Sequence, residues 1–170
     1  SCTMKYNPRL NEDMAALDGF ADTHPLQPAT DVQGNLELLS TLGDLLAHLT
    51  GMDHTTLQPV AGAQGEFAGL LMIRAFLTRQ GDARKVILTP DSAHGTNPAT
   101  ASMCGYAVEE VHSGPDGCVD VEYLKKHLRP DVAGLMITVP NTLGIFERNI
   151  AQICALMHEN GSQVYVDGAN

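Results

Sequence analysis

The sequence predicts an α/β protein with a doubly wound, mostly parallel sheet, preceded by a helical N-terminal arm. From residue 62 onward, short apolar runs that favour strands alternate with longer segments of helical period. One of these runs, residues 134–140, is apolar almost throughout, as is typical of a strand that is covered on both faces. Strands that alternate with helices in this way favour a parallel sheet with helices on both sides.

The first third of the chain predicts the arm. Leucines recur at helical spacing between residues 35 and 50, and Gly51 follows as a helix stop. Prolines at positions 25 and 28 interrupt regular structure before this helix. We therefore expect residues 1–56 to form an N-terminal arm and helix, and residues 57–170 to form the α/β part.

The elements of the α/β part are predicted from the spacing of apolar residues and from the turn and capping residues that bound each segment. Strands are expected at residues 85–90, 106–111, 134–140 and 163–167. Helices are expected at residues 66–79, 99–103, 120–127 and 147–160, the third of them capped by Asp120. The helix at 66–79 is apolar on most faces, which predicts that it is buried.

Composition excludes several classes of protein. The net charge of −10 argues against a nucleic-acid surface, which needs clustered lysine and arginine. No apolar run approaches the length of a bilayer span and no secretory signal opens the sequence, so we expect neither membrane insertion nor secretion. The cysteines show no metal-ligand spacing, so we expect reduced thiols at Cys2, Cys104, Cys118 and Cys154.

Three polar clusters follow predicted strands, at residues 91–98, 141–144 and 167–170. Ligands of open α/β sheets bind beyond the carboxyl ends of the strands, so these clusters form the candidate site. His94 lies in the first cluster and can be functional or a satisfied structural residue. Asp167 ends the last strand, where a carboxylate can bind a ligand cation or a metal, or can simply form a turn. Residues 62–66 (GAQGE) open a helix that could bind an anion such as phosphate, or serve only the chain path.

Six segments resemble the P-protein family of the glycine cleavage system, in the same order as in that family. They are residues 1–8 (SCTMKYNP), 57–59 (LQP), 61–66 (AGAQGE), 91–98 (DSAHGTNP), 140–147 (PNTLGIFE) and 166–170 (VDGAN). The resemblance is to the second subunit of the two-subunit form, or to the C-terminal half of the single-chain form. It implies part of the large domain of a fold type I enzyme, the aspartate-aminotransferase type, with pyridoxal 5'-phosphate (PLP) as cofactor.

The family decarboxylates glycine and passes the aminomethyl group to the lipoyl arm of H-protein, with PLP as the electron sink. The resemblance therefore implies glycine, lipoylated H-protein and the first P-protein subunit, or the other half of a single chain, as partners. It implies neither a nucleic acid nor a membrane as a partner. It places the protein in the bacterial cytoplasm, or in mitochondria if the parent is eukaryotic.

The resemblance also implies roles for individual residues. Asp167 matches the carboxylate that bonds the pyridine nitrogen, and His94 matches the imidazole that stacks on the ring. Ala169 would pack near the opposite face. Ala63 and Gln64 would meet the phosphate at the start of a helix. The further cofactor-binding candidates, from matching motifs and without an individual role, are Thr96, Asn97 and Thr142.

The chain departs from the family in two ways. The cofactor lysine of the family follows the VDGAN motif by some tens of residues, and no lysine follows Asp167 here. We therefore expect this chain to be a piece of a longer enzyme and to be inactive alone. Val139 stands where the family often has asparagine, which leaves one hydrogen bond to the cofactor in doubt. Two alternatives are another fold type I enzyme, such as an aminotransferase or amino-acid decarboxylase, and a non-catalytic module that binds a partner.

Overall fold

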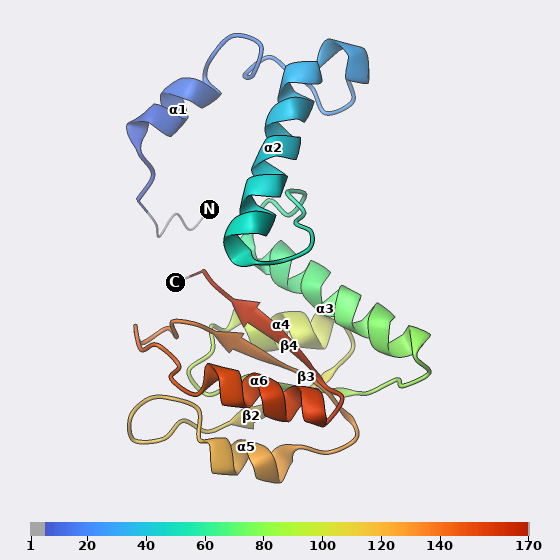
Figure 1. Cartoon of the computed structure of the whole chain (residues 1–170), viewed down its shortest axis with the longest axis vertical. Coiled ribbons are helices and arrows are strands. Elements are labelled where there is room, and N and C mark those ends of the chain that lie inside the picture. Colours follow the sequence, from blue (N-terminus) through green and yellow to red (C-terminus); the bar gives the residue numbers. More distant parts are fainter. Residues whose placement is uncertain (1–5, 170) are drawn as a thin grey trace. The chain divides into compact units, whose positions relative to one another are not determined.

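A computed structural model describes residues 6–169, and the chain divides into two compact units with the boundary between Pro59 and Val60 (Figure 1). Cys2, the first part of the segment at residues 1–8 and Asn170 lie outside the described residues. The first unit contains α1 (Arg9–Ala15), the 3-10 helix η1 (Ala29–Asp31) and α2 (Gln33–Thr50). Gly51 ends α2 in the left-handed conformation, with φ of 70°, which is the usual place for glycine after a helix.

The second unit contains a four-stranded sheet in the order β2-β1-β3-β4. Its strands are β1 (Val86–Pro90), β2 (Ala107–Val111), β3 (Val132–Thr138) and β4 (Gln163–Asp167). All three strand pairs are parallel, so the predicted parallel sheet is confirmed. Every residue of β1 and β3 is buried, because these two strands lie in the middle of the sheet and are covered on both faces. The carboxyl ends of all four strands consequently meet at one edge.

Helices cover both faces of the sheet, as the doubly wound prediction requires (Figure 1). On one face, α3 (Gly62–Arg79) and α4 (Thr96–Met103) contribute to a buried cluster with Ile87 and Met136. On the other face, α5 (Val121–His127) and α6 (Ile150–Glu159) contribute to a cluster with Leu88 and Leu135. Side chains of a strand alternate between faces, so Tyr165 of β4 packs against the α3/α4 cluster while Val164 packs against the α5/α6 cluster.

Several predicted details were wrong, among them the start of α4, which lies at Thr96 and not at residue 99. The third strand begins at Val132 and ends at Thr138, ahead of Val139 and Pro140. The helix expected at 147–160 begins only at Ile150, because the buried carboxylate of Glu147 accepts hydrogen bonds from the amides of Val119 (2.8 Å) and Asn149 (3.1 Å). The first helix of this unit is not buried all round, since Leu71, Met72 and Phe76 are exposed and only one side of α3 packs on the sheet.

The amino edge of the sheet is held by the side chain of Arg84. Its Nη1 donates to the carbonyl oxygens of Val132 (3.0 Å) and Asn160 (2.7 Å) and to the hydroxyl of Ser162 (3.3 Å). The Ser162 hydroxyl in turn donates to Val132 O at 2.9 Å. Arg84 precedes β1, Val132 is the first residue of β3, and Asn160 and Ser162 precede β4. One nearly buried guanidinium therefore satisfies polar groups where three strands begin.

Two further expectations concern the described part of the chain. None of its helices combines the length and apolarity that a membrane crossing demands. Cys104, Cys118 and Cys154 carry free thiols, and burial raises the pKa of the Cys154 thiol.

Candidate active site at the carboxyl edge of the sheet

The parallel sheet brings the three predicted polar clusters to one edge. β1, β3 and β4 are neighbours. Residues 91–98 and 141–144 follow the carboxyl ends of β1 and β3, and the described part of the third cluster, residues 167–169, begins at the last residue of β4. The hydroxyl of Thr142 donates a hydrogen bond to Ser92 O, which ties the loop after β3 to the loop after β1. Thr142 therefore supports the first loop.

Ala63 and Gln64 lie in the exposed first turn of α3. The residue before the helix, Ala61, has no side-chain oxygen, so it cannot cap the first amides of α3. Gln64 makes only local hydrogen bonds. Its side-chain Oε1 accepts from Val60 N at 2.8 Å, and its backbone amide donates to Ala61 O at 3.1 Å. The amides of Gly62 and Ala63 are the groups at this helix start that remain suited to an anion.

His94 is linked to the interior through a hydroxyl. Its Nδ1 lies 2.8 Å from Thr96 Oγ1, and Thr96 Oγ1 donates to Glu66 Oε1 at 2.7 Å. The amide of Thr96 also points at Nδ1, at 3.2 Å. The imidazole is exposed, whereas Glu66 is buried on the sheet side of α3. The exposed ring of His94 is thus linked, through the hydroxyl of Thr96 in α4, to the buried carboxylate of Glu66 in α3.

A second polar group gathers around Asp167. The hydroxyl of Thr138 lies 3.5 Å from Asp167 Oδ2 and 3.5 Å from Asn97 Oδ1, both long contacts. The amide of Ala169 donates to Asp167 Oδ1 at 2.9 Å, which turns the chain directly after β4. Asp167 is half-buried, Ala169 is exposed and Asn97 is fully buried. The carboxylate therefore retains accepting capacity for a ligand.

Tyr165 connects these groups electrostatically. Burial raises its pKa to about 12, with further contributions from the negative charges of Asp167 and Glu66. The phenol therefore stays neutral beside two carboxylates. Sequence reasoning gave no role to Glu66, Thr138 or Tyr165. A usable signal was the period of two, which places residues 165 and 167 on the same face of β4.

Two buried side-chain atoms have no hydrogen-bond partner among the described residues, and both belong to this region. They are Glu66 Oε2 and Asn97 Nδ2. An unpaired buried polar atom costs roughly 1–3 kcal/mol, so one acceptor and one donor are left for a ligand or water. Metal ligation has no comparable support here: nowhere within residues 6–169 do three histidine, cysteine or acidic side chains gather as metal ligands would.

The side chains of Val139 and Asp91 do not join these groups, although the backbone amide of Val139 donates to Asp167 O at 2.9 Å. Val139 packs against the α5/α6 cluster, on the face of the sheet opposite to Tyr165. Asp91 accepts hydrogen bonds from the amide and hydroxyl of Ser113, after the end of β2. Burial acts to raise the pKa of Asp91, but the Ser113 hydrogen bonds and nearby His112 outweigh it, so the pKa is lowered. Asp91 therefore anchors its own loop.

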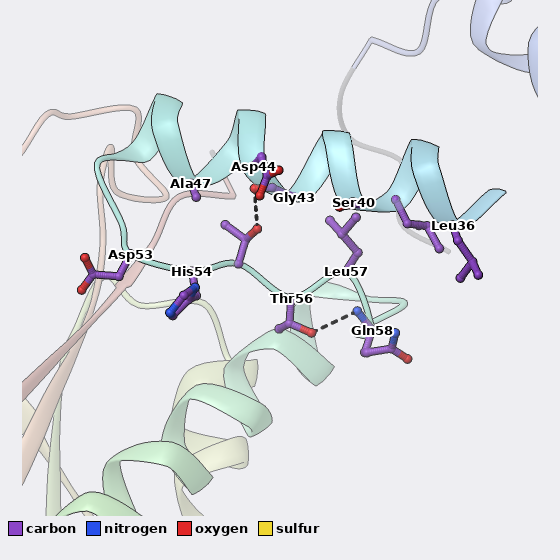
Figure 2. A pocket seen from close by; sticks show the side chains of 12 residues that line it. Leu36, Ser40, Gly43, Asp44, Ala47, Asp53, His54, Thr56, Leu57 and Gln58 are labelled. Carbon is purple, nitrogen blue, oxygen red and sulfur yellow. Dashed lines mark hydrogen bonds between the residues drawn. The ribbon is translucent and has the colours of Figure 1, made fainter. Parts of the chain in front are cut away.

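A separate groove lies within the first unit, between α2 and residues 53–58 (Figure 2). It encloses about 450 Å³, and the Thr55 hydroxyl spans it by donating to Gly43 O at 2.7 Å. Leu36 and Leu39 line it together with the acidic side chains of Asp44 and Asp53. None of the residues with a predicted site role lines this groove.

The fold and this edge together define a class of protein. Residues 65–170 match the family "aminotransferase class-V", which is more than half of the chain, and the chain belongs to that family. Over its whole length it is 55% identical to a relative from Alkaliphilus oremlandii, named probable glycine dehydrogenase (decarboxylating) subunit 2. The predicted resemblance is confirmed by this match. The chain spans 35% of the length of that relative.

Solved structures agree on the fold. A glycine decarboxylase (P-protein) of the glycine cleavage system, in inhibitor-bound form, superposes with a TM-score of 0.75 at 20% identity, over 94% of this chain and 35% of that one. The Oryza sativa protein TDC, solved with PLP, gives 0.68 at 15% identity, over 95% and 39%. At these identities the likeness concerns the fold alone, and it confirms the predicted fold type I architecture.

Proposed function

We propose that this chain forms part of the cofactor pocket of a PLP-dependent glycine dehydrogenase (decarboxylating). The observation that carries the proposal is the placement of Asp167, His94 and the start of α3 around one sheet edge, in a chain 55% identical to a subunit of that name. Because the relative is about three times longer, the activity belongs to the whole enzyme and needs residues outside this chain.

The donor and acceptor set at this edge fits PLP. The cofactor carries a dianionic phosphate, which needs hydrogen-bond donors. Its protonatable ring nitrogen needs a carboxylate, and the oxygen on its ring needs a hydrogen-bond donor. The uncapped amides at Ala63 would hold the phosphate, and Asp167 would face the ring nitrogen. Gln64 would support this turn through its bond to Val60 N. The unpartnered Nδ2 of buried Asn97 is a donor available to the ligand.

Asp167 performs the electrostatic part of the chemistry. When bound, PLP takes up the electron pair that glycine retains as CO2 leaves. Asp167 holds a proton at the pyridine nitrogen, because a carboxylate next to that nitrogen favours its cationic form. Neutral Tyr165 beside Asp167 avoids a further negative charge at this point.

His94 and Ala169 bound the ring from two sides in this proposal. His94 supplies a flat imidazole, and the small side chain of Ala169 leaves room on the other side. Thr96 holds His94 by its hydroxyl, and Thr142 holds the same loop through Ser92 O. These two threonines would therefore act on the cofactor through the loop after β1.

The substrate and partners follow from the proposed reaction. They are glycine, lipoylated H-protein, and the first P-protein subunit or the other half of a single chain. The enzyme would act in the bacterial cytoplasm, or in mitochondria in a eukaryotic source. The two alternatives from the sequence differ in outcome: another PLP enzyme would act on a different amino acid, and a partner-binding module would retain no PLP.

The full-length enzyme tests the proposal in two measurements. PLP retention after gel filtration, followed by its visible absorbance, separates a cofactor enzyme from a partner-binding module. Exchange of labelled bicarbonate into the glycine carboxyl group then separates glycine decarboxylation from other PLP reactions, with alanine as the control substrate. Retained PLP without glycine exchange would point to another enzyme of this fold, and absence of PLP would overturn the proposal.

A further inference from the structure

The contact between Thr96 and His94 raises a question of proton position. Thr96 Oγ1 lies 2.8 Å from His94 Nδ1 and 2.7 Å from Glu66 Oε1. A threonine hydroxyl has one proton, so it can donate to only one of these neighbours and must accept from the other. The choice decides which ring nitrogen of His94 carries the proton.

A carboxylate at Glu66 leaves one arrangement in which both short contacts are attractive. Glu66 Oε1 is acceptor only, so it takes the hydroxyl proton of Thr96. Thr96 Oγ1 then offers a lone pair to the ring, and Nδ1 must carry the proton that fills it. In this arrangement the Thr96 amide no longer donates to Nδ1, so the longer 3.2 Å contact is given up. If Nδ1 instead accepted from that amide, its lone pair would face the lone pair of Oγ1 at the shorter distance of 2.8 Å.

The opposite arrangement also leaves the buried carboxylate without a partner. Glu66 is 5% exposed, and its Oε2 already lacks a hydrogen-bond partner among residues 6–169. If the Thr96 hydroxyl turned toward Nδ1, both oxygens of a buried carboxylate would be unpaired, which is strongly unfavourable.

We propose that Glu66 sets the tautomer of His94 through the hydroxyl of Thr96, with Nδ1 protonated and Nε2 left as a hydrogen-bond acceptor. Glu66 and Thr96 are positioning residues here, since both act through His94. The inference adds to the proposed function, because it gives His94 an accepting nitrogen that could take a hydrogen bond from a ligand of the pocket. The tautomer itself needs no cofactor, so it can be tested separately.

The experiment is nitrogen NMR of the full chain labelled with ¹⁵N in the histidine rings, at a pH where imidazole is neutral, about 8.5. The chemical shifts of Nδ1 and Nε2 distinguish a protonated from an unprotonated nitrogen, and His94→Gln identifies the signals of His94. The wild type is expected to show protonated Nδ1. A wild type with protonated Nε2 would overturn the proposal before any further variant is made.

Variants then test the relay. Thr96→Val removes the hydroxyl and Glu66→Met removes its acceptor, so both should move the proton to Nε2, with Nδ1 accepting from the backbone amide of residue 96. Thr96→Ser keeps the hydroxyl and should keep the wild-type tautomer. The control is Thr100→Val, which changes a buried threonine one turn later in α4. Protonated Nδ1 in both Thr96→Val and Glu66→Met would show that something other than this relay sets the tautomer.

The outcomes remain distinguishable from those of the proposed function. Loss of PLP binding or glycine exchange in the wild-type enzyme with protonated Nδ1 would refute the function and leave the relay standing. PLP binding and glycine exchange in a wild-type enzyme with protonated Nε2 would refute the relay and leave the proposed function standing. A variant that unfolds is recognised by the loss of dispersion in its amide proton chemical shifts. In that case the tautomer of His94 in the wild type still decides whether the proposal holds.

Discussion

Gly69 of α3 lies directly against the ring of Tyr165 in β4. A Cβ atom at position 69 would stand 2.7 Å from both Cδ2 and Cε2 of that ring. Such a separation is far below van der Waals contact, and an aromatic ring wedged between helix and sheet cannot yield as a flexible side-chain end can. Glycine is therefore required at this crossing, and the position of Tyr165 depends on it.

Gly69→Ala is accordingly expected to destabilise the fold by roughly 1–3 kcal/mol through overpacking. The matched control is Gly65→Ala, one turn earlier in the same helix, where an added Cβ meets nothing within 4 Å. That change should be neutral or stabilising by up to about 1 kcal/mol, since alanine favours helix over glycine. Urea unfolding of both variants measures the difference, and equal stability would show that the Tyr165 ring moves aside freely.

Alkaline pH should weaken the fold through Tyr165. Its pKa is raised from 10.0 to about 12 in the folded protein, first by burial and then by Asp167 and Glu66. The folded state therefore binds the phenolic proton more tightly than the unfolded chain does. The resulting stabilisation is complete below pH 10 and is lost as the pH rises toward 12.

The free energy of unfolding between about pH 9 and pH 12 provides the test. Tyr165→Phe should flatten its decline, because no proton is then lost at this site. Tyr123→Phe leaves Tyr165 in place and should retain the decline. An identical slope in wild type and Tyr165→Phe would mean that the phenol is more accessible than its packing indicates.

Asp167→Asn should impair the full-length enzyme without unfolding it. Asparagine keeps the shape but not the charge, so the pyridine nitrogen would lose the partner that keeps it protonated. Loss of one preorganised electrostatic contact typically lowers turnover by about 10²–10³, or roughly 3–4 kcal/mol. Glycine–bicarbonate exchange at saturating PLP measures this. The control Asp120→Asn alters the N-cap of α5, where asparagine is an equally good cap, and should change neither turnover nor stability.

His94→Ala should weaken retention of PLP. Loss of a stacked ring is worth roughly 0.5–1.5 kcal/mol, by analogy with aromatic pairs, which corresponds to a rise in the dissociation constant of about two- to thirteenfold. Equilibrium dialysis of the full-length enzyme measures it, with His158→Ala as the control, since His158 is exposed in the last turn of α6. Unchanged PLP affinity and turnover in His94→Ala would remove His94 from the pocket.

The sheet was largely predictable, since β1 and β3 are mostly apolar and β4 was placed at its observed bounds. The strand order was not, because period alone does not say which strands are neighbours. In the candidate site, Asp167 and His94 could be selected because they follow strands. The partnership of Glu66 with Thr96 could not, since it joins residues thirty positions apart on two helices.

The same limit applies to buried polar residues. Glu66 and Asn97 are polar residue types that usually remain exposed, and nothing in their spacing predicts that both lie within the α3/α4 side of the molecule. Glu147 was taken for the first residue of a helix, whereas its buried carboxylate organises the chain before α6. Hydrogen-bond partners contributed by distant segments decided these positions.

The Arg84 network and the candidate site occupy opposite ends of the same three strands, β1, β3 and β4. The Arg84 side chain satisfies polar groups where the strands begin, and the chemistry is assigned to where they end. Substitutions at Arg84 or Ser162 should lower the yield of folded protein while leaving the specific activity of each surviving molecule intact. The loops at the carboxyl ends of the strands can therefore change in sequence, and selection for a new reaction can act on them, without loss of the hydrogen bonds that Arg84 makes at the amino ends.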